Sequence, residues 1–463
     1  MSKPLIGRVV RRLRTEQGVA QQALAARLGI SASYLNLIEH DQRAVTAAIL
    51  IKLTEALGVD IATLSGHSEK AMETSLREVF ADQALGSEKV PDVEVAALAA
   101  SAPGAARAIL ALYRAWRVAR EDSAGLALPS GRRLLMPTEE TRDFFHDRAN
   151  HFPALEALTE TLGQELGATA AGMNHAIAER LRSRHGVRVA VGPLDGALRR
   201  YDPAARLLAL SETLPRESRG FQMAFQLLLL EAGEPVDTLI RDAAPSTPDA
   251  AALIRIGLLN YAAGALLMPY QPFHAAARTL RHDLDALAAR FGVSFEQAAH
   301  RLCTLQREGL RGLPFFFLRV DLAGNVDKRF SAAGFPFARF GGSCPKWVVH
   351  QAFTTPGTLR VQHAALPDGA RFLCFARTVQ GQGRGWGDPP PLHVVAMGCD
   401  AAHAGDILYA EGMDMKHDPV GIGLSCRLCD RTDCRSRAFP PLDHRLTLDP
   451  NEDGTSPWRF EKG

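Results

Sequence analysis

Three cysteines close together near the end of the chain are the residues best suited to chemistry. Cys426, Cys429 and Cys434 have the spacing Cys-x2-Cys-x4-Cys. Three thiolates this close are unfavourable without a cation, and thiolates are common ligands of iron–sulfur clusters and of zinc. The pattern predicts a metal site holding either a [4Fe-4S] cluster or zinc, with Cys344 or Cys399 as the fourth ligand. A structural group of reduced thiols is the alternative.

Cysteine use and composition indicate an intracellular globular protein. All seven cysteines lie in the last third of the 463 residues, unlike the framework of a small secreted domain. The net charge is +2, with 46% hydrophobic and 22% charged residues. The longest apolar stretches, Phe221–Leu230 and Ile256–Met268, are shorter than the ~20 residues that span a bilayer. We expect a cytoplasmic protein of roughly three domains with no membrane partner. For zinc, His403 or His444 are further candidates for the fourth ligand.

The first 66 residues have the pattern of a small helical domain. Apolar residues at helical spacing predict a helix that ends at Gly18, and further helices over Gln21–Leu28, Ala32–Glu39 and Thr46–Leu57. Ser31 is placed to cap the third of these helices, after a turn that contains glycine. Two short helices joined by such a turn form a helix-turn-helix.

Polar side chains of this domain suit DNA. The first fourteen residues contain five cations and no anion, as phosphate contacts require. Hydroxyl, amide and guanidinium groups on and after the third helix can read base edges in the major groove. The predicted base-reading residues are Ser33, Tyr34, Asn36 and Arg43, and the cations are Lys3, Arg8, Arg11, Arg12 and Arg14. A plain helical bundle is the alternative to a domain that binds a double-stranded operator.

Residues 67–150 are rich in alanine and charge, and predict a helical connector. An apolar stripe is expected there, broken or kinked at Pro103-Gly104. Helix-turn-helix proteins commonly bind two half-sites as dimers, so we favour a dimerisation element, in a homodimer or higher homo-oligomer, over a passive spacer. The stripe comprises Leu98, Ile109, Leu112, Tyr113 and Trp116.

The rest of the chain predicts two α+β domains, over residues 151–314 and 315–463. The fold class is therefore multidomain α+β, with an all-α helix-turn-helix head over residues 1–66 and a helical connector. In the first α+β domain we predict strands Val187–Val191 and Leu207–Leu210, and helices Phe221–Glu231, Ala251–Met268, Phe273–Phe291 and Phe295–Gly309. In the second we predict strands Phe315–Asp321, Val326–Phe330, Leu359–Gln362, Arg371–Arg377 and Leu392–Met397.

The head resembles the repressor/Cro-type (XRE) helix-turn-helix family. The resemblance rests on the run from Gly29 through Glu39, followed by Arg43. It implies that Gln21 begins the second helix and contacts phosphate. In place of the usual serine or threonine cap, Ala20 precedes that helix. With this resemblance, the predicted DNA-binding residues are Gln21, Ser31, Ser33, Tyr34, Asn36 and Arg43.

The domain over residues 151–314 resembles the ImmA/IrrE-type metallopeptidase-like domain. Active members carry His-Glu-x-x-His on one helix, where two imidazoles hold zinc and the glutamate acts as general base. The matching positions here are Phe225, Gln226 and Leu229, which provide no imidazole and no carboxylate. We therefore predict that the chain is not an enzyme, and that this domain binds a ligand or stabilises a dimer. A passive scaffold is the alternative.

The C-terminal domain resembles that of the short-chain fatty acyl transcriptional regulators. The matching residues are Gly342–Trp347, Val349-His350, Phe353, Pro356-Gly357, Leu366–Gly369, Ala376-Arg377, Gly398–Asp400, Tyr409–Gly412, the three-cysteine run and Arg437–Leu442. The resemblance implies a regulator of acetate, propionate or propionyl-CoA metabolism that responds to a short-chain acyl-CoA, with an iron–sulfur cluster in some relatives. No cysteine precedes Cys303, so an N-terminal fourth ligand has no counterpart.

Two other hypotheses assign this chain to different functional classes, a metallopeptidase and a redox sensor. A metallopeptidase that cleaves a separate repressor would need the zinc helix that this sequence lacks. A redox sensor would control DNA affinity through the cysteine cluster, and this hypothesis is compatible with acyl-CoA sensing. The sequence identifies neither the acyl chain, nor the operator, nor the acyl-CoA pocket.

Overall fold

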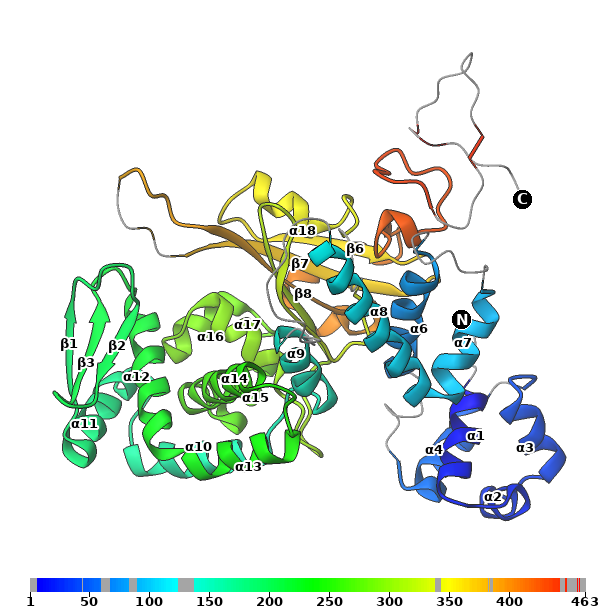
Figure 1. The fold of residues 1–463 in the computed structure, drawn as a ribbon, viewed down its shortest axis with the longest axis horizontal. Helices are drawn as coiled ribbons and strands as arrows, with labels where there is room; N and C mark the ends of the chain where they lie inside the picture. The colour runs from blue at the N-terminus through cyan, green and yellow to red at the C-terminus, as the bar shows by residue number, and fades with distance from the viewer. Residues whose placement is uncertain are drawn as a thin grey trace. The chain divides into compact units, whose positions relative to one another are not determined.

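The computed structural model describes residues 6–43, 45–59, 67–82, 90–123, 137–337, 343–381, 383, 386–441, 446–447, 456 and 458. Its contacts divide the chain into two compact units (Figure 1). Unit 1 comprises residues 1–134, 334–343 and 424–463, and unit 2 comprises residues 135–333 and 344–423. Helical domains and sheet-containing α+β domains are both present, so the predicted fold class is confirmed.

The head in unit 1 contains the four predicted helices. They are α1 (Gly7–Glu16), α2 (Gln21–Leu28), α3 (Ala32–Glu39) and α4 (Ala47–Leu57). Local signals set these bounds: Gly29 ends α2 in a left-handed conformation, with φ of 70°, and Ser31 and Thr46 cap the next two helices. The four helices enclose a small apolar core, in which Leu24, Leu28, Leu35, Ile38 and Leu53 are completely buried.

The connector in unit 1 contains α6 (His67–Phe80), α7 (Asp92–Ser101) and α8 (Pro103–Ser123). The predicted break is confirmed, because α8 begins at Pro103 and the chain bends by 113° between α7 and α8. The residues of the predicted apolar stripe differ in exposure. Leu112 is 67% exposed, whereas Leu110 and Tyr113 face the small core of the connector.

The helical part of unit 2 carries a three-stranded sheet with strand order β1-β3-β2 at one edge, beside α11 and α12 (Figure 1). The strands β1 and β3 confirm two predictions, whereas β2 was not predicted, because its sequence Arg-Arg-Tyr-Asp carries no apolar signal. The elements are α9 (Pro137–Asp147), α10 (Pro153–Leu166), α11 (Met173–His185), β1 (Arg188–Gly192), β2 (Arg199–Asp202), β3 (Leu207–Ser211), α12 (Arg216–Glu231), α13 (Gly233–Ala243) and α14 (Pro248–Leu267).

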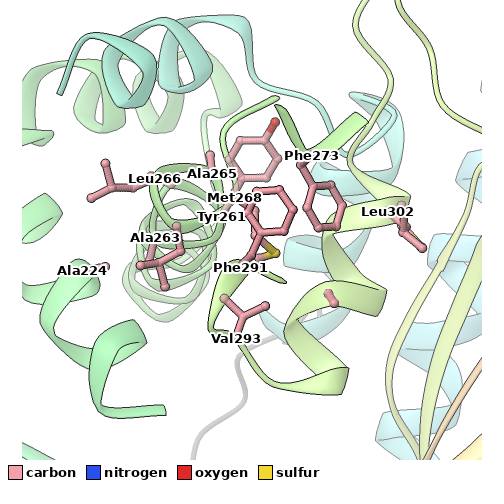
Figure 2. Packing of buried hydrophobic residues seen from close by; sticks show 14 of the residues in the cluster. Ala224, Tyr261, Ala263, Ala265, Leu266, Met268, Phe273, Phe291, Val293 and Leu302 are labelled. Carbon is pink, nitrogen blue, oxygen red and sulfur yellow. The ribbon is translucent and has the colours of Figure 1, made fainter. Parts of the chain in front are cut away.

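Two predicted helices of unit 2 need correction. The predicted helix Phe273–Phe291 is two helices, α15 (Tyr270–Thr279) and α16 (Leu284–Phe291). Arg281 and His282 adopt left-handed backbone conformations between them, with φ of 48° and 62°. Figure 2 shows Phe273 and Phe291 meeting in the core, with ring centroids 5.1 Å apart. The predicted helix Phe295–Gly309 corresponds to α17 (Phe295–Cys303), which ends six residues earlier.

A six-stranded sheet forms the rest of unit 2, with strand order β5-β4-β8-β7-β6-β9. Its pairs are antiparallel except β6 with β9. Gly398 on β8 is required by packing, because a Cβ there would lie 2.5 Å from the Phe316 ring. The strands are β4 (Phe316–Asp321), β5 (Val326–Ser331), β6 (Arg360–Ala365), β7 (Arg371–Gln380), β8 (Leu392–Asp400) and β9 (Val420–Gly421), with the short helix α18 (Val348–Gln351) before β6.

In the described part of the chain, α14 is long and apolar enough to cross a bilayer, and α7 with the start of α8 passes the same test as a bent pair. However, α14 lies in the core of unit 2, where Ile254, Leu258 and Leu266 are at most 1% exposed. Packing inside the unit therefore accounts for the apolar character of this helix.

Candidate nucleic-acid interface

Helix α3 presents a polar outer face. The Ser31 hydroxyl accepts a hydrogen bond from the Tyr34 backbone N–H at 3.1 Å and so begins the helix. Ser33 and Asn36 are exposed, while Tyr34 is half-buried against the head core. Arg43 is exposed just beyond the helix. The structure thus places short polar groups on the outer face of α3 and one guanidinium just beyond it, which are the kinds of side chain that read base edges in a major groove.

A buried carboxylate behind this face fixes its position. Glu39 is 1% exposed and accepts hydrogen bonds from Arg14 Nε at 2.7 Å and Arg14 Nη2 at 3.1 Å. Gln21 Nε2 donates to the same carboxylate at 2.8 Å and to Asn36 Oδ1 at 3.3 Å. The hydrogen bond to Glu39 raises the pKa of Arg14. Glu39 therefore links three helices and orients Gln21, which in turn donates to Asn36.

This arrangement corrects the prediction that Arg14 belongs to a set of phosphate-binding cations. The Arg14 guanidinium pairs with Glu39 inside the head, and the Arg14 side chain is only 15% exposed. Arg8 Nε lies 3.5 Å from Asp41 Oδ2, and Arg11 Nη1 lies 3.4 Å from His40 Nε2. Lys3 lies outside the described residues. Sequence reasoning named Glu39 only as the last residue of the run that carries the family resemblance, because its position at the end of α3 carries no signal of burial.

A close backbone contact joins the first and third helices of the head. The Gly7 N–H donates to Asp41 Oδ1 at 2.7 Å. A Cβ on Gly7 would lie 1.8 Å from the Ile38 carbonyl oxygen. Only glycine allows α1 and the end of α3 to approach this closely.

In unit 2, α12 carries the positions that match a zinc-binding helix. Phe225 is buried, Leu229 is 42% exposed, and Gln226 is completely buried. Within the described part of the chain, neither amide atom of Gln226 has a hydrogen-bond partner. From β2, the guanidinium carbon of Arg199 lies 4.0 Å from the centroid of the Phe225 ring. Arg199 itself is half-buried, but its Nη1 is buried and has no hydrogen-bond partner among the described residues. Partial burial lowers the pKa of this arginine. Sequence reasoning missed Arg199 together with its strand.

Another arginine of unit 2, Arg301, is buried and fully paired. Arg301 Nη1 and Nη2 donate to the two carboxylate oxygens of Glu156 at 2.7 and 2.9 Å, and Arg301 Nε donates to the Met268 carbonyl at 3.0 Å. Tyr261 donates to Glu156 Oε1 at 2.5 Å. Burial opposes ionisation of Glu156, but Arg301 and the Tyr261 hydroxyl outweigh it and hold the pKa of Glu156 below its usual range.

The three-cysteine loop of unit 1 is built around a buried arginine. Arg437 is 3% exposed and donates to the carbonyls of Cys426 at 2.5 Å and Cys429 at 2.7 Å. The Ala438 N–H donates to Cys426 Sγ at 3.4 Å. Cys426 and Cys434 are partly exposed, and Cys429 is buried. Sequence reasoning named Arg437 only as part of the run that carries the family resemblance and assigned it no role in this loop.

The two proposed fourth ligands belong to unit 2. Cys344 and Cys399 are both buried, and burial raises the pKa of the Cys399 thiol to about 12. Such a thiol resists the deprotonation that metal binding needs. Among the residues that the structure describes, no three histidine, cysteine or acidic side chains gather as a metal site would require. The metal site and its ligands therefore stay a prediction.

Comparisons with known proteins agree with this arrangement. Residues 10–64 match the helix-turn-helix family, residues 182–303 match the IrrE N-terminal-like domain, and residues 304–458 match the family described as short-chain fatty acyl coenzyme A regulator, C-terminal. The HTH-type transcriptional regulator RamB of Mycobacterium tuberculosis is 40% identical over 99% of both chains. The chain belongs to the short-chain fatty acyl coenzyme A regulator family.

Further relatives of this regulator cover nearly all of it. The HTH-type transcriptional regulator PrpR of Mycobacterium tuberculosis is 39% identical over 99% of this chain and 96% of its own. The propionyl-CoA carboxylase regulator of Cereibacter sphaeroides is 40% identical over 98% of both chains. A solved structure titled Mycobacterium tuberculosis transcriptional regulator is 42% identical, covers 70% of this chain and 99% of its own, and gives a TM-score of 0.68. The predictions of a DNA-binding transcriptional regulator and of a non-enzyme are confirmed.

Unit 2 of the regulator contains a pocket of about 540 Å³. The starts of α12 and α17 line it together with β7, through residues such as Ser218, Glu296 and Arg377. Arg377 pairs with Asp285 at 2.7 Å and stacks on the Phe295 ring at 3.6 Å. The pocket therefore lies against the same helix that carries Gln226.

Proposed function

We propose that this regulator binds an operator as a homodimer and adjusts transcription of genes for short-chain fatty acid metabolism in response to a short-chain acyl-CoA. The observation that carries the DNA-binding part is the outer face of α3, which Glu39 fixes from behind. Ser33, Tyr34, Asn36 and Arg43 read base edges. Gln21 and Ser31 contact the phosphate backbone.

The effector part of the proposal is supported by the family and by the names of the relatives. One relative at 40% identity is named a propionyl-CoA carboxylase regulator, which favours propionyl-CoA or acetyl-CoA. We assign DNA binding to residues 1–66, dimerisation to 67–150, and effector sensing to 151–314 and 315–463, in a cytoplasmic protein. An effector changes operator binding only if it binds the two states of the regulator with different affinity.

The DNA-binding part is tested with the full-length protein. An operator is first selected from random double-stranded DNA, and its affinity is then measured by fluorescence anisotropy at fixed salt. Ser33→Ala, Asn36→Ala and Arg43→Ala are each expected to weaken binding roughly tenfold, because a base contact contributes about 1–3 kcal/mol. Glu55→Gln, on the exposed side of α4, is the control and should bind normally. Normal binding by all three variants would reject this recognition surface.

The effector part is tested with the same operator. Propionyl-CoA and acetyl-CoA are expected to change the dissociation constant at least fivefold, which is the usual scale of allosteric coupling. Free coenzyme A and the corresponding fatty acid serve as controls. An operator affinity that is indifferent to both acyl-CoAs would reject acyl-CoA as the effector while leaving DNA binding intact.

A metal-dependent redox input is the second candidate function. Two observations favour it: Arg437 holds the carbonyls of Cys426 and Cys429, and a backbone N–H donates to Cys426 Sγ, as in sites that stabilise thiolates. Iron, acid-labile sulfide and zinc are measured in protein purified without oxygen, with Cys429→Ser as the control. Matching iron and sulfide that disappear in the variant support a [4Fe-4S] cluster. Zinc alone supports a structural site, and the absence of metal rejects both.

Dimerisation is supported by exposed apolar residues of the connector. Val93 is 68% exposed and Leu112 is 67% exposed. Sedimentation velocity of the full-length regulator should show a dimer that Leu112→Glu weakens. A wild-type monomer at micromolar concentration would reject the dimer.

A further inference from the structure

The three-stranded sheet of unit 2 has two edge strands of opposite character. The strand order β1-β3-β2 leaves β1 and β2 at the edges, and Figure 1 shows β1 on the outer side of the sheet. The strand β2 reads Arg-Arg-Tyr-Asp, and charges of this kind protect an edge from pairing with another chain. The centre of β1 is Val189, Ala190 and Val191, without a charge, a proline or a bulge. The edge of β1 therefore lacks the usual protection.

The backbone of β1 directs hydrogen-bonding groups away from the sheet. Within residues 137–337, all of which the structure describes, β1 has a strand neighbour on one side only, the parallel strand β3. The Arg188 N–H donates to the Arg206 carbonyl beside β3 at 2.9 Å. In a parallel ladder, every second residue from Arg188 onward bonds to this neighbour. The N–H and C=O groups of Val189 and Val191 therefore point outward.

This outward edge is short and has fixed ends. Before the strand, the buried Val187 donates its N–H to the Leu181 carbonyl at 2.9 Å. After the strand comes Pro193, which has no N–H to donate. Between these ends, Val191 is 50% exposed and Ala190 is exposed as well. A partner strand can therefore pair with few residues, which restricts the possible registers.

Two antiparallel copies of β1 fit one another in such a register. With a two-fold axis at Ala190, Val189 of one copy lies opposite Val191 of the other, and the two residues exchange both backbone hydrogen bonds. Arg188 then lies opposite Gly192, so like charges do not meet. The same pairing covers the exposed Val191 side chain with the Val189 side chain of the other copy. The match in hydrogen bonds, charge and shape favours a second copy of this chain as the occupant.

We propose that β1 pairs with β1 of a second copy of this chain, so that the two small sheets become one continuous sheet across a two-fold axis. A two-fold contact uses the same surface on both subunits, and a strand added at a sheet edge gains affinity from main-chain hydrogen bonds. This contact belongs to unit 2 and is separate from the connector surface of Val93 and Leu112. It depends on neither the operator nor the effector.

A disulfide across the axis tests the pairing in the full-length protein. In the proposed register the two Ala190 Cα atoms lie about 4.5 Å apart, within the range that a disulfide spans. Ala190→Cys should therefore form a covalent dimer with oxidised glutathione. More than half of the chains should be cross-linked on a non-reducing gel, and reductant should reverse the link.

Ala209→Cys is the matched control, because Ala209 is the neighbour of Ala190 on β3. In the proposed dimer, two residues 209 are three strand spacings apart, about 14 Å, which is too far for a disulfide. Wild-type protein reports any cross-link through the partly exposed Cys426 and Cys434. An Ala190→Cys protein that stays monomeric, or that cross-links no more than Ala209→Cys, would overturn the pairing.

A charge on the edge should weaken the pairing. Val191→Lys, added to Ala190→Cys, should lower the yield of covalent dimer at least fivefold, because a lysine replaces the valine contact at the edge. Ile256→Lys is the matched control, since Ile256 on α14 is 48% exposed, and it should leave the yield within twofold. Equal yields with Val191→Lys and Ile256→Lys would count against the pairing.

Hydrogen exchange gives a readout that needs no cysteine variant. The Val189 amide should exchange at least fivefold faster in Val191→Lys than in wild type or Ile256→Lys, while the amides of β3 exchange alike in all three proteins. Equal exchange of the Val189 amide in the three proteins would overturn the pairing. Because these experiments contain neither operator nor acyl-CoA, their failure would leave the proposed operator and effector responses standing.

Discussion

Two arginines of unit 2 have opposite surroundings. Arg301 has an acceptor for each of its guanidinium nitrogens, and its partner Glu156 is itself paired with Tyr261. Arg199 has an aromatic ring beneath it and an unpaired nitrogen. A buried cluster in which every polar atom is hydrogen-bonded stabilises the fold. A buried polar atom without a hydrogen-bond partner contributes no such stabilisation and remains able to bind another group. Breaking each kind of cluster should therefore have different consequences.

The largest loss of stability is expected from Glu156→Gln. This change removes the anion and leaves the Arg301 cation buried, which typically costs about 3–5 kcal/mol. Urea denaturation followed by circular dichroism measures the change. Glu160→Gln is the control, because Glu160 pairs with Arg307 where both side chains are partly exposed, and should cost less than about 1 kcal/mol. Equal stability of the two variants would contradict the distinction between the clusters.

Glu39→Gln extends the comparison to the head, where the polar cluster is also satisfied. The change removes the charge that holds Arg14 and weakens the acceptor for Gln21. Hydrogen bonds to charged groups contribute about 1.5–3 kcal/mol, so the variant should lose about 2 kcal/mol of stability. Operator affinity should fall with it, because Gln21 is no longer oriented. Glu16→Gln is the matched control, since Glu16 lies 3.9 Å from Arg12 with more than half of its side chain exposed. An unchanged operator affinity in Glu39→Gln would show that α3 keeps its position without this cluster.

The helices of the head could be predicted from sequence much better than the buried polar contacts of unit 2. Caps and stops such as Ser31 and Gly29 act within a few residues, so the four head helices were predicted close to their bounds. Glu156 and Arg301 are 145 residues apart, and no local pattern indicates that they meet. Arg199 lies on a strand that exists because it pairs with β3, a contact that local propensity does not encode.

Gly7→Ala tests the close approach of α1 to the end of α3, a contact that does not involve the hydrogen bonds of Glu39. The added methyl group would overlap the Ile38 carbonyl, so α1 and α3 must separate. Overpacking of this kind costs between about 1 and 3 kcal/mol, and the smaller end is expected because the site lies at a helix end. Gly104→Ala in α8 is the control, because a Cβ there meets no atom within 4 Å. That variant should gain up to about 1 kcal/mol in a urea unfolding experiment. A Gly7→Ala protein as stable as wild type would mean that the helix end shifts freely.

The smallest effect on stability is expected for His282, a buried residue that, unlike Arg301, meets a backbone carbonyl and an aromatic ring and, among the described residues, no carboxylate. Its Nδ1 is 3.1 Å from the Asp406 carbonyl oxygen, and its ring meets Phe315 edge to face. Burial lowers the pKa of this imidazole, so the folded state keeps it neutral at a pH where the unfolded chain takes up a proton. Stability must therefore fall as the pH drops below about 6.5, by at most about 1.4 kcal/mol per pH unit for this residue.

His282→Gln removes this titration while keeping an amide that can donate to Asp406. The unfolding free energy of wild type and variant is compared between pH 7 and pH 5, where the variant should have the shallower slope. Because the other histidines are common to both proteins, the difference in slope reports His282 alone. Parallel slopes would show that His282 is protonated as readily in the folded protein as in the unfolded chain. In that case, a single backbone acceptor would suffice to satisfy a buried cation, and the contrast between Arg301 and Arg199 would lose its basis.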